Sequence, residues 1–487
     1  MIISLHKQRI LKVVALMSVF IIATTVFFIS ANTFGGNNDQ GAYQPTPPGS
    51  PPPPTNISQI PRDARTSANP HIRWEQNIGG NLNDYAKAIF DVMGYYFVIG
   101  QTSSTTHDFM GLKNDAIPNL FISKLNKSGR LLEIVVINSG VAEHFVRAFP
   151  YGQGFKIIAN RDTSAIFYIF CVAEKRVIYH RAFEGQAKDA FLDSDRLAII
   201  VFETNRISIN FIQIESFYRE DYTITILKNG RNLYYAGFIP HLTDFYLSGG
   251  HIGDGFLSGQ YLLVLNHTNQ NRTNTLIYKV TEENAVLSLT LNNLFANQIL
   301  PYRAGGFLLA GTESTHNPRG RVFAINNMLM QTALSYTSTN INVTRMSVVH
   351  YMHGYIIITE FVGSNNMGYA NINVVCMNLR ITHPYINDIP NFPTLSCFIP
   401  LNNNWSNLIL TFNIRVQGFS GILVIRFSEN AIKSTQHIGG TSNDTLTRSL
   451  QAPGNAITIL ASTTSTSKDI GTNHGLSDLW LARIIYL

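Results

Sequence analysis

Two segments that lie 360 residues apart share enough residues to be copies of one structural unit. Residues 71–84 read HIRWEQNIGGNLND, and residues 431–444 read AIKSTQHIGGTSND. Extending this ungapped match to residues 111 and 471 gives 11 identities in 41 positions, including Asp84 with Asp444. A chain with matching units at both ends is restricted to repeat architectures, in which each unit packs on its neighbours.

Between the two copies, a recurring order of elements predicts eight units of about 51 residues. Each unit has a Gly-type turn followed by a β-branched and aromatic strand, which we take as its second strand. First strands are expected near residues 86, 143, 188, 244, 297, 344, 396 and 445. Second strands are expected at 94–102, 154–162, 196–204, 260–268, 305–313, 354–362, 407–416 and 455–463. Four short strands per unit at this period indicate an all-β chain folded as a β-propeller.

The ends of the repeat region favour a closed ring over an open solenoid. The last unit stops at Leu487 after its third strand, whereas residues 71–80 align with a fourth strand at 431–440. The N-terminal strand is therefore predicted to complete the last blade. We expect eight blades, and seven is the alternative if the weak unit between 188 and 244 is part of a neighbouring unit or an insertion. Cys376 and Cys397 would then lie in different blades, too far apart for a disulfide.

The residues before 71 predict an anchor and a stalk. Residues 13–30 carry no charge over a length that crosses a bilayer as a helix. The basic tail 1–12 would remain in the cytoplasm, which makes 13–30 a single-pass signal anchor and exports the rest of the chain. A cleaved signal peptide is the alternative, and it exports the same residues. Residues 31–70 are rich in Gly and Pro and predict a disordered stalk before the propeller at 71–487.

Composition and motifs exclude several classes of function. Charged residues make up 14% of the chain, and three of the six net positive charges lie in the basic tail. Since no basic stripe follows, we expect no nucleic-acid partner. No nucleophile elbow, phosphate loop, H-E-x-x-H or C-x-x-C motif occurs, so we expect no catalytic set, no cofactor and no metal. His350 and His353 lack a third ligand of fitting type nearby.

The pattern W-x-x-x-I-G-G-x-x-x-D, extended by a Gly turn and a closing K-L, runs from Trp74 to Leu125. It resembles the repeat of bacterial extracytoplasmic β-propeller proteins and lipoproteins of unassigned function. The resemblance is clear in the first and last units only. It implies the propeller fold and export, and it implies no catalytic residues.

Candidate binding residues lie in two kinds of loop. In the Gly-Gly-x-x-x-Asp segments, Asp84 and Asp444 could bind a cation or a sugar hydroxyl, or they could cap the turn into the next strand. The loops Thr102–Pro118 and Thr463–Ser477 are the longest that follow a second strand, and such loops often carry function. Their candidates are Asp108, Asp115 and Asp469.

We therefore expect a membrane-anchored extracytoplasmic module that binds or scaffolds a protein or a glycan. The alternative is an exported polysaccharide hydrolase or lyase with a site at the centre of the ring. That enzyme would need two carboxylates from different blades about 5–9.5 Å apart.

Overall fold

The computed structural model describes a chain of β-strands with one turn of 3-10 helix, His107–Phe109. The described residues are 53, 55–58, 71–193, 196–213, 221–240, 261–269, 272–281, 283–302, 306–326, 328–351, 354–376, 379, 381–391, 393–401, 404–416, 419–453, 455–466, 470 and 473–485. The predicted basic tail 1–12, the predicted span 13–30 and most of the predicted stalk lie outside them. Among the described residues, no helix is long and apolar enough to cross a membrane.

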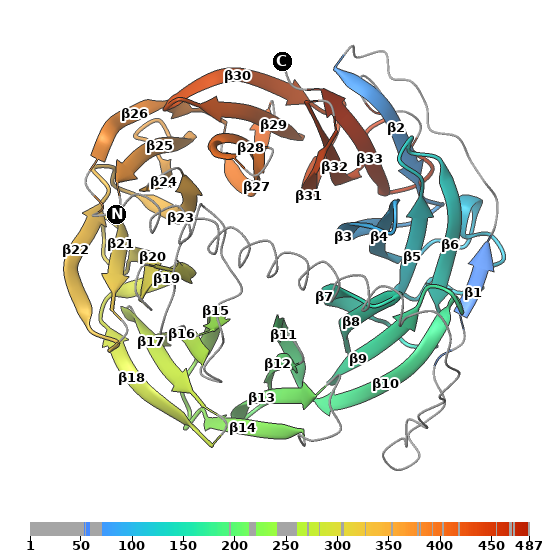
Figure 1. Ribbon diagram of the computed structural model, residues 1–487, viewed down its shortest axis with the longest axis horizontal. Coiled ribbons are helices and arrows are strands. Elements are labelled where there is room, and N and C mark those ends of the chain that lie inside the picture. Colours follow the sequence, from blue (N-terminus) through green and yellow to red (C-terminus); the bar gives the residue numbers. More distant parts are fainter. Residues whose placement is uncertain are drawn as a thin grey trace, which may run out of the picture. The chain divides into compact units, whose positions relative to one another are not determined.

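Eight antiparallel sheets surround a common centre (Figure 1). The fold is an eight-bladed β-propeller, which confirms the predicted all-β class and decides for eight blades over seven. Within a blade, strands that follow one another along the chain are hydrogen-bonded neighbours.

The blades are numbered in chain order, with strands given from the centre outward. Blade 1 has β3 (Asp84–Val92), β4 (Tyr95–Thr102), β5 (Asn119–Leu125) and β6 (Leu131–Ile137); blade 2 has β7 (His144–Tyr151), β8 (Gly154–Arg161), β9 (Ser164–Cys171) and β10 (Arg176–Glu184). Blade 3 has β11 (Gln186–Asp193), β12 (Arg196–Phe202), β13 (Arg206–Gln213) and β14 (Tyr222–Leu227); blade 4 has β15 (Leu233–Pro240), β16 (Tyr261–Asn269), β17 (Arg272–Val280) and β18 (Ala285–Leu291).

The second half of the ring repeats this order. Blade 5 has β19 (Leu294–Pro301), β20 (Phe307–Glu313), β21 (Gly320–Ile325) and β22 (Gln331–Thr337); blade 6 has β23 (Val343–Tyr351), β24 (Gly354–Val362), β25 (Gly368–Cys376) and β26 (Ile381–Ile389). Blade 7 has β27 (Thr394–Leu401), β28 (Asn404–Val416), β29 (Phe419–Ser428) and β30 (Ala431–Ile438); blade 8 has β31 (Asp444–Ala452), β32 (Ala456–Thr463), β33 (Asp478–Ile485) and β2 (Ile72–Ile78).

The ring closes through β2, as predicted. This N-terminal strand pairs antiparallel with β33, the third strand of blade 8 and the last strand of the chain, with Gln76 opposite Leu481. The buried Trp480 donates its Nε1 hydrogen to Glu75 Oε2 at 3.0 Å, so the two ends of the repeat region also share a buried polar bond. Closure pairs the outer edge of β33 with a strand that is distant in sequence.

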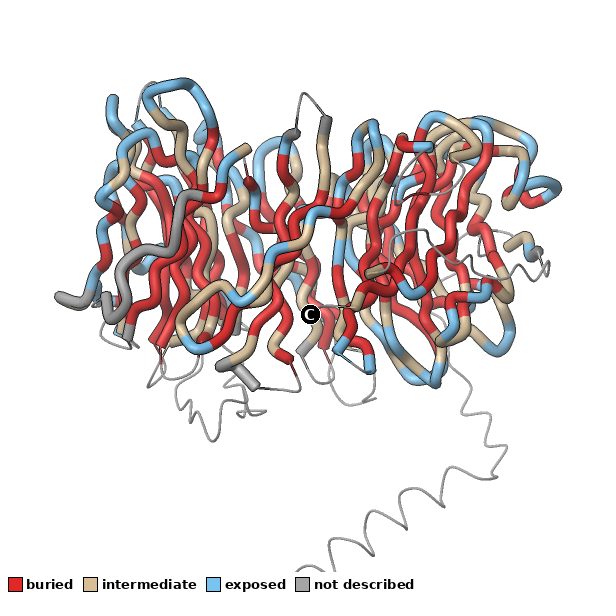
Figure 2. Tube along the Cα trace, turned by 90° about the horizontal axis from the view of Figure 1, so that it is seen from above, coloured by how far each residue is buried: buried red, intermediate tan, exposed pale blue. Residues whose placement is uncertain are grey.

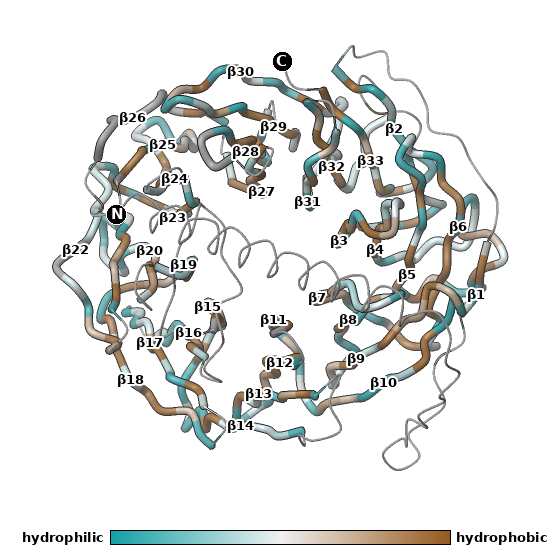
Figure 3. Tube along the Cα trace, in the orientation of Figure 1, coloured by the Kyte–Doolittle hydropathy of each residue, from teal (hydrophilic) through white to brown (hydrophobic). Residues whose placement is uncertain are grey.

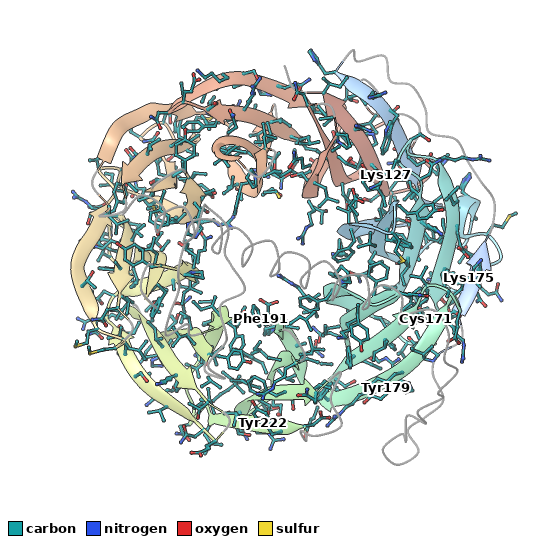
Figure 4. The ribbon with its side chains drawn as sticks, viewed as in Figure 1. Lys127, Cys171, Lys175, Tyr179, Phe191 and Tyr222 are labelled. Carbon is teal, nitrogen blue, oxygen red and sulfur yellow. The ribbon has the colours of Figure 1, made fainter. Side chains whose placement is uncertain are left out.

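Hydrophobic side chains fill the space between neighbouring blades. Second strands such as β4 and β32 are buried over almost their whole length, because adjacent blades cover both of their faces. One core cluster joins Leu460 of blade 8 to Phe121 of blade 1 across the closure. Figure 2 shows buried strands between exposed loops, and Figure 3 shows hydrophobic stretches in the strands of the blades. Figure 4 places Phe191 between blades 3 and 4, where its ring lies 6.3 Å from that of Phe238.

Two features differ from the sequence-based expectation. The first strand of blade 4 is Leu233–Pro240 and does not lie near residue 244. Both 233–240 and 244–248 are rich in aromatic and apolar residues, and spacing alone favoured the later run. In addition, β1 (Thr55–Ser58) lies inside the predicted stalk yet adds a fifth strand to the outer edge of blade 1, where it pairs with β6. The unpaired edge of β6 gives this short segment backbone partners.

Every inner strand carries a β-bulge at the same depth. In β3 the register shifts between Ala86 and Ala88, and the other seven inner strands shift at the equivalent place. The bulged residues are Lys87, Val146, Lys188, Ala236, Asn297, Thr344, Ser396 and Thr447. A bulge re-aims the side chains around it, so this repeat sets the direction of the side chains on the inner strands.

Side-chain to backbone hydrogen bonds join neighbouring blades at the residue just before the bulge. Asn266 of blade 4 accepts a hydrogen bond from Ala296 N at 2.8 Å and donates one to Ala296 O at 2.9 Å. The same pair of bonds joins Asn160 to Ala187 and Asn413 to Leu446. A single side chain thus satisfies both backbone polar groups of one residue in the next blade.

Candidate functional site

One end of the ring gathers both of the loops that were singled out from the sequence. Asp84 at the start of β3 pairs with Thr102 at the end of β4, which pairs with Asn119 at the start of β5. The loops 103–118 and 464–477 each join a second strand to a third strand, so both lie at this end. We call this end of the propeller the loop face.

Asp84 is fully buried at the base of the loop face and bonds to its own blade. Its Oδ2 accepts hydrogen bonds from Gly80 N at 2.8 Å and from Ser104 Oγ at 2.7 Å. Burial raises the pKa of Asp84 to about 6, although the hydrogen bonds of Thr102 and Ser104 act in the opposite direction. This geometry ties the loop before β3 to the loop after β4, and it leaves the carboxylate out of contact with solvent.

Asp444 takes the same place in blade 8. It accepts hydrogen bonds from Gly440 N at 2.6 Å, Thr463 Oγ1 at 2.5 Å and Ser465 Oγ at 3.1 Å. Gly439 has a φ of +144°, a conformation that disfavours any side chain. These contacts are of the capping kind, and whether Asp84 or Asp444 also contacts a ligand stays a prediction.

The loops of blades 1 and 8 interlock across the closure. Gly79 N donates to Asp108 Oδ2 at 3.0 Å, and Asp108 N donates to Gly79 O at 3.3 Å. A Cβ on Gly79 would lie 2.0 Å from Asp478 Oδ1, and a Cβ on Gly475 would lie 2.0 Å from Gly80 O. Both glycines are required by close approach, because Gly79 faces the start of β33 and Gly475 faces the segment between β2 and β3.

Asp115 lies in the same loop and is paired with a buried lysine. Lys113 Nζ lies 3.6 Å from Asp115 Oδ1 and donates to Thr102 O at 3.1 Å. The Lys113 side chain is fully buried and that of Asp115 is 39% exposed. Burial lowers the pKa of Lys113, while the charge of Asp115 acts in the opposite direction. This pair holds the loop 103–118 in place.

The remaining candidates give no assembled site. Asp469 and His353 lie outside the described residues. His350 packs 5.1 Å from the Tyr355 ring, and burial lowers its pKa. Within the described part of the chain, no group of three His, Cys, Asp or Glu side chains is placed to hold a metal ion. Cys171 and Cys397 are free.

A small exposed surface forms where the two loops meet. The rings of His107 and His474 stack with centroids 4.6 Å apart. Met110, whose N–H bonds to His107 O, is 71% exposed, and Leu476 is 61% exposed. We call these four side chains, His107, Met110, His474 and Leu476, the closure patch. Exposed apolar side chains that gather on one surface are a feature of contact sites.

The bulges of the inner strands mark a second distinct set of side chains, which no sequence pattern predicted. We call the bulged residue of each inner strand and the residue after it the belt. Its charged members are Lys87, Arg147, Lys188, Asp189, Arg345 and Arg448. The single belt carboxylate, Asp189, accepts a hydrogen bond from Tyr235 Oη at 2.7 Å and lies 3.7 Å from Arg147. The belt thus offers five cations and one carboxylate, and it lacks the carboxylate pair that the enzyme alternative needs.

Blade 2 has a charged cluster where blades 1 and 8 have their buried aspartates. Glu143, which is buried, bonds through N to Pro118 O just as Asp84 N bonds to Ser477 O. Its carboxylate accepts from Tyr168 Oη and from Arg161 Nε, the latter at 2.9 Å. Burial raises the pKa of Glu143, against the opposite effect of its two partners. All of its groups bond to one another, so this cluster secures the blade.

No protein-family model matches the sequence, and no curated protein matches it. Among solved structures, the Dos1 propeller is 10% identical with a TM-score of 0.46 over 84% of this chain and 94% of that one. A prolyl endopeptidase is 11% identical with a TM-score of 0.47 over 78% of this chain, which spans 54% of that enzyme's length. The polysaccharide lyase Uly1 is 8% identical with a TM-score of 0.38, covering 71% and 90% of the two chains. At these values the similarities carry no argument about function, and the resemblance to exported bacterial propellers stays a prediction.

Proposed function

We propose that this chain is an exported, membrane-anchored binding module whose propeller receives a protein partner at the closure patch. The stacked histidines and the two exposed apolar side chains of the patch support this proposal most directly. They stand on the interlocked loops of blades 1 and 8, so little conformational entropy is lost when a partner binds. The propeller fold suits a binding or scaffolding role, because it presents loops on a rigid ring.

The anchor part of the proposal rests on residues 13–30 and the basic tail before them. A full-length chain held by a membrane helix should stay in the membrane pellet after washing at pH 11. Its propeller should be degraded by protease added outside intact cells. Release of the chain by the alkaline wash, with an intact mass that shows removal of the first 30 or so residues, would instead establish a cleaved signal peptide.

The partner site can be tested with a matched pair of surface variants. In the full chain, Met110→Ser with Leu476→Ser removes the apolar side chains of the closure patch. The control is Met328→Ser with Met330→Ser, because those side chains are 73% and 55% exposed in the turn between β21 and β22, away from the loop face. Both double variants should keep the thermal midpoint of the wild type, since all four side chains are exposed.

The measurement is crosslinking in intact cells, followed by quantitative mass spectrometry of the captured proteins. We expect at least one protein to be captured by the wild type and by the control, and to fall about tenfold with the patch variant. Capture that is equal for all three chains, or lost equally in both variants, would contradict a partner site at the closure patch.

A further inference from the structure

The belt carries positive charge on four consecutive blades. Arg448, Lys87, Arg147 and Lys188 belong to blades 8, 1, 2 and 3, and the inner strands of these blades come within 8 Å of their neighbours, Cα to Cα. The belt residues of blades 4, 5 and 7 are uncharged. The cations therefore form an arc along one half of the ring.

This charge is poorly compensated within the described structure. Asp189 is the only belt carboxylate, and it is shared between Arg147 and Tyr235. Burial lowers the pKa of Lys87, whose Nζ lies 5.4 Å from the centroid of the Tyr85 ring. The pKa of Lys228 is lowered by burial and further by the charge of Lys188. An anion at the arc would offset these unfavourable terms.

Arg448 is the belt cation most open to a ligand. In most blades the side chain after the bulge bonds to the next inner strand, as Gln298 does with Val348 and as Arg345 does with Leu395 O. Arg448 is exposed and makes no such bond within the described residues. Its guanidinium has five N–H donors for a carboxylate or a sulfate.

Ring side chains are exposed two residues before the bulge in blades 1, 2, 4 and 5, so they lie partly in the arc and partly beyond it. Tyr85 is 41% exposed, Tyr234 is 53% exposed and Phe295 is 39% exposed, and His144 at the same position is also exposed. Neighbouring blades cover both faces of an inner strand, so side chains exposed on it face the centre of the ring or its loop end. Aromatic rings in such places provide flat apolar surfaces next to polar groups, which suits the C–H face of a sugar ring.

We propose that the centre of the ring binds an acidic oligosaccharide, with the cationic arc holding its acidic groups and the exposed aromatic rings packing on its sugars. Arginine and lysine would make charge-assisted hydrogen bonds to the carboxylates or sulfates of the ligand. The spread of cations over four blades fits an elongated ligand with several charges. This second binding site is separate from the closure patch and does not depend on it.

The test uses the detergent-solubilised full chain and isothermal titration calorimetry. The probes are a galacturonic acid hexamer, its fully methyl-esterified form, a heparin-derived hexasaccharide and inorganic phosphate. We expect at least one acidic hexasaccharide to bind, and to bind several-fold more weakly when NaCl rises from 50 to 300 mM. The methyl-esterified hexamer has the same rings without charge and should bind at least tenfold more weakly than the acid.

Variants locate the site and separate it from the closure patch. Arg448→Gln should weaken binding about tenfold and Tyr234→Ala several-fold, with thermal midpoints near that of the wild type because both side chains are exposed. Arg176→Gln on the outer strand β10 changes net charge equally, and it should bind as the wild type does. The closure-patch double variant should also bind normally, so failure of either proposal is visible without the other.

Four outcomes would overturn the proposal. They are binding of neither acidic hexasaccharide, equal binding of the acid and its methyl ester, equal losses in Arg448→Gln and Arg176→Gln, and complete competition by phosphate at the concentration of the hexamer. Complete competition by phosphate would mean that the arc binds a single small anion and not an oligosaccharide.

Discussion

Blades 1 and 8 share a buried motif but obtain their outer strands in different ways. In both blades an aspartate accepts hydrogen bonds from a Gly N–H and from the hydroxyl two residues beyond the second strand, in Ser104 and Ser465. Blade 1 builds all four strands from one continuous segment and then adds β1. Blade 8 borrows β2 from the other end of the repeat region. The same local motif therefore occurs in blade 1, whose four strands come from one continuous segment, and in blade 8, which is complete only when the two ends of the repeat region meet.

The largest expected effect comes from removing the borrowed strand. Deleting residues 71–80 exposes the outer edge of β33 and removes the buried side chains of Ile72, Trp74 and Ile78. At about 2 kcal/mol for each buried side chain, we expect a loss of roughly 6 kcal/mol in the free energy of unfolding. Urea unfolding followed by intrinsic fluorescence measures it.

Deleting residues 55–58 is the matched control, since it removes the outer strand that blade 1 adds. Thr55, Asn56 and Ile57 are not buried, so the free energy of unfolding should fall by about 1 kcal/mol or less. Equal losses in the two deletions would refute the idea that closure depends on β2.

The second comparison is with blade 2, where a charged cluster replaces the buried aspartate. Tyr168→Phe keeps the ring but removes the hydroxyl that donates to Glu143 and accepts from Arg161 Nη2 at 2.6 Å. Two bonds to charged partners are lost at a buried position, so we expect a cost of about 3 kcal/mol in urea unfolding. Tyr369→Phe, which loses one exposed bond to Asn365, should change stability by less than about 0.5 kcal/mol. A Tyr168→Phe variant as stable as that control would show that the cluster contributes little.

The third prediction concerns how the free energy of unfolding depends on pH, and it compares the buried Asp84 with an exposed carboxylate. The folded pKa of about 6 lies above the model value of 3.8, so the folded state holds its proton more tightly than the unfolded state does. This contribution to stability is complete below pH 3.8 and is lost as pH rises through about 6. Between pH 4.5 and 7.5 it amounts to about 2 kcal/mol, from the linkage relation.

Asp84→Asn should therefore remove a decline of about that size from the pH profile of the wild type, measured by urea unfolding at closely spaced pH values. The control Asp91→Asn alters a side chain that is 41% exposed and should leave the profile unchanged. A profile that is the same in the wild type and in Asp84→Asn would refute the raised pKa.

The sequence predicts the ring and its closure because these depend on local composition and on one long-range match. Thr463 and Ser465, whose hydroxyl groups donate to Asp444, were not recognised from the sequence for a definable reason. The hairpin of blade 8 leaves three residues between Ala452 and Ala456, whereas that of blade 1 leaves two between Val92 and Tyr95. An ungapped alignment therefore sets Thr102 against Ser462, although Thr463 is its structural equivalent. One gap at the hairpin would have revealed the shared motif.

The belt is a different case, because no sequence pattern marks it. The bulged residue is Lys87 in blade 1, Val146 in blade 2 and Ala236 in blade 4, so the position is fixed by backbone geometry and not by residue type. The cations around it lie far apart in the chain, and their grouping follows from the ring. Charge at the centre could be recognised only once the register of each inner strand was known.

The smallest expected effect concerns the hydrogen bonds between a side chain of one blade and the inner strand of the next. Their pattern at the closure differs from that between other blades. Between blades 4 and 5, Asn266 bonds to both the N–H and the carbonyl of Ala296. Between blades 8 and 1, Ser462 only accepts from Ala86 N, at 3.2 Å, and Thr447 donates to Ala86 O instead. We expect Ser462→Ala to cost about 1 kcal/mol and Asn266→Ala at least twice that. Ser462→Ala loses one bond, whereas Asn266→Ala loses three, because Asn266 also accepts from Thr275 Oγ1 at 3.1 Å. If the closure is held mainly by β2 and by the interlocked loops, the double variant Ser462→Ala with Thr447→Val should still unfold in a single transition in urea. A separate early transition in that variant would instead show that the inner strands, and not the outer one, keep the two ends of the ring together.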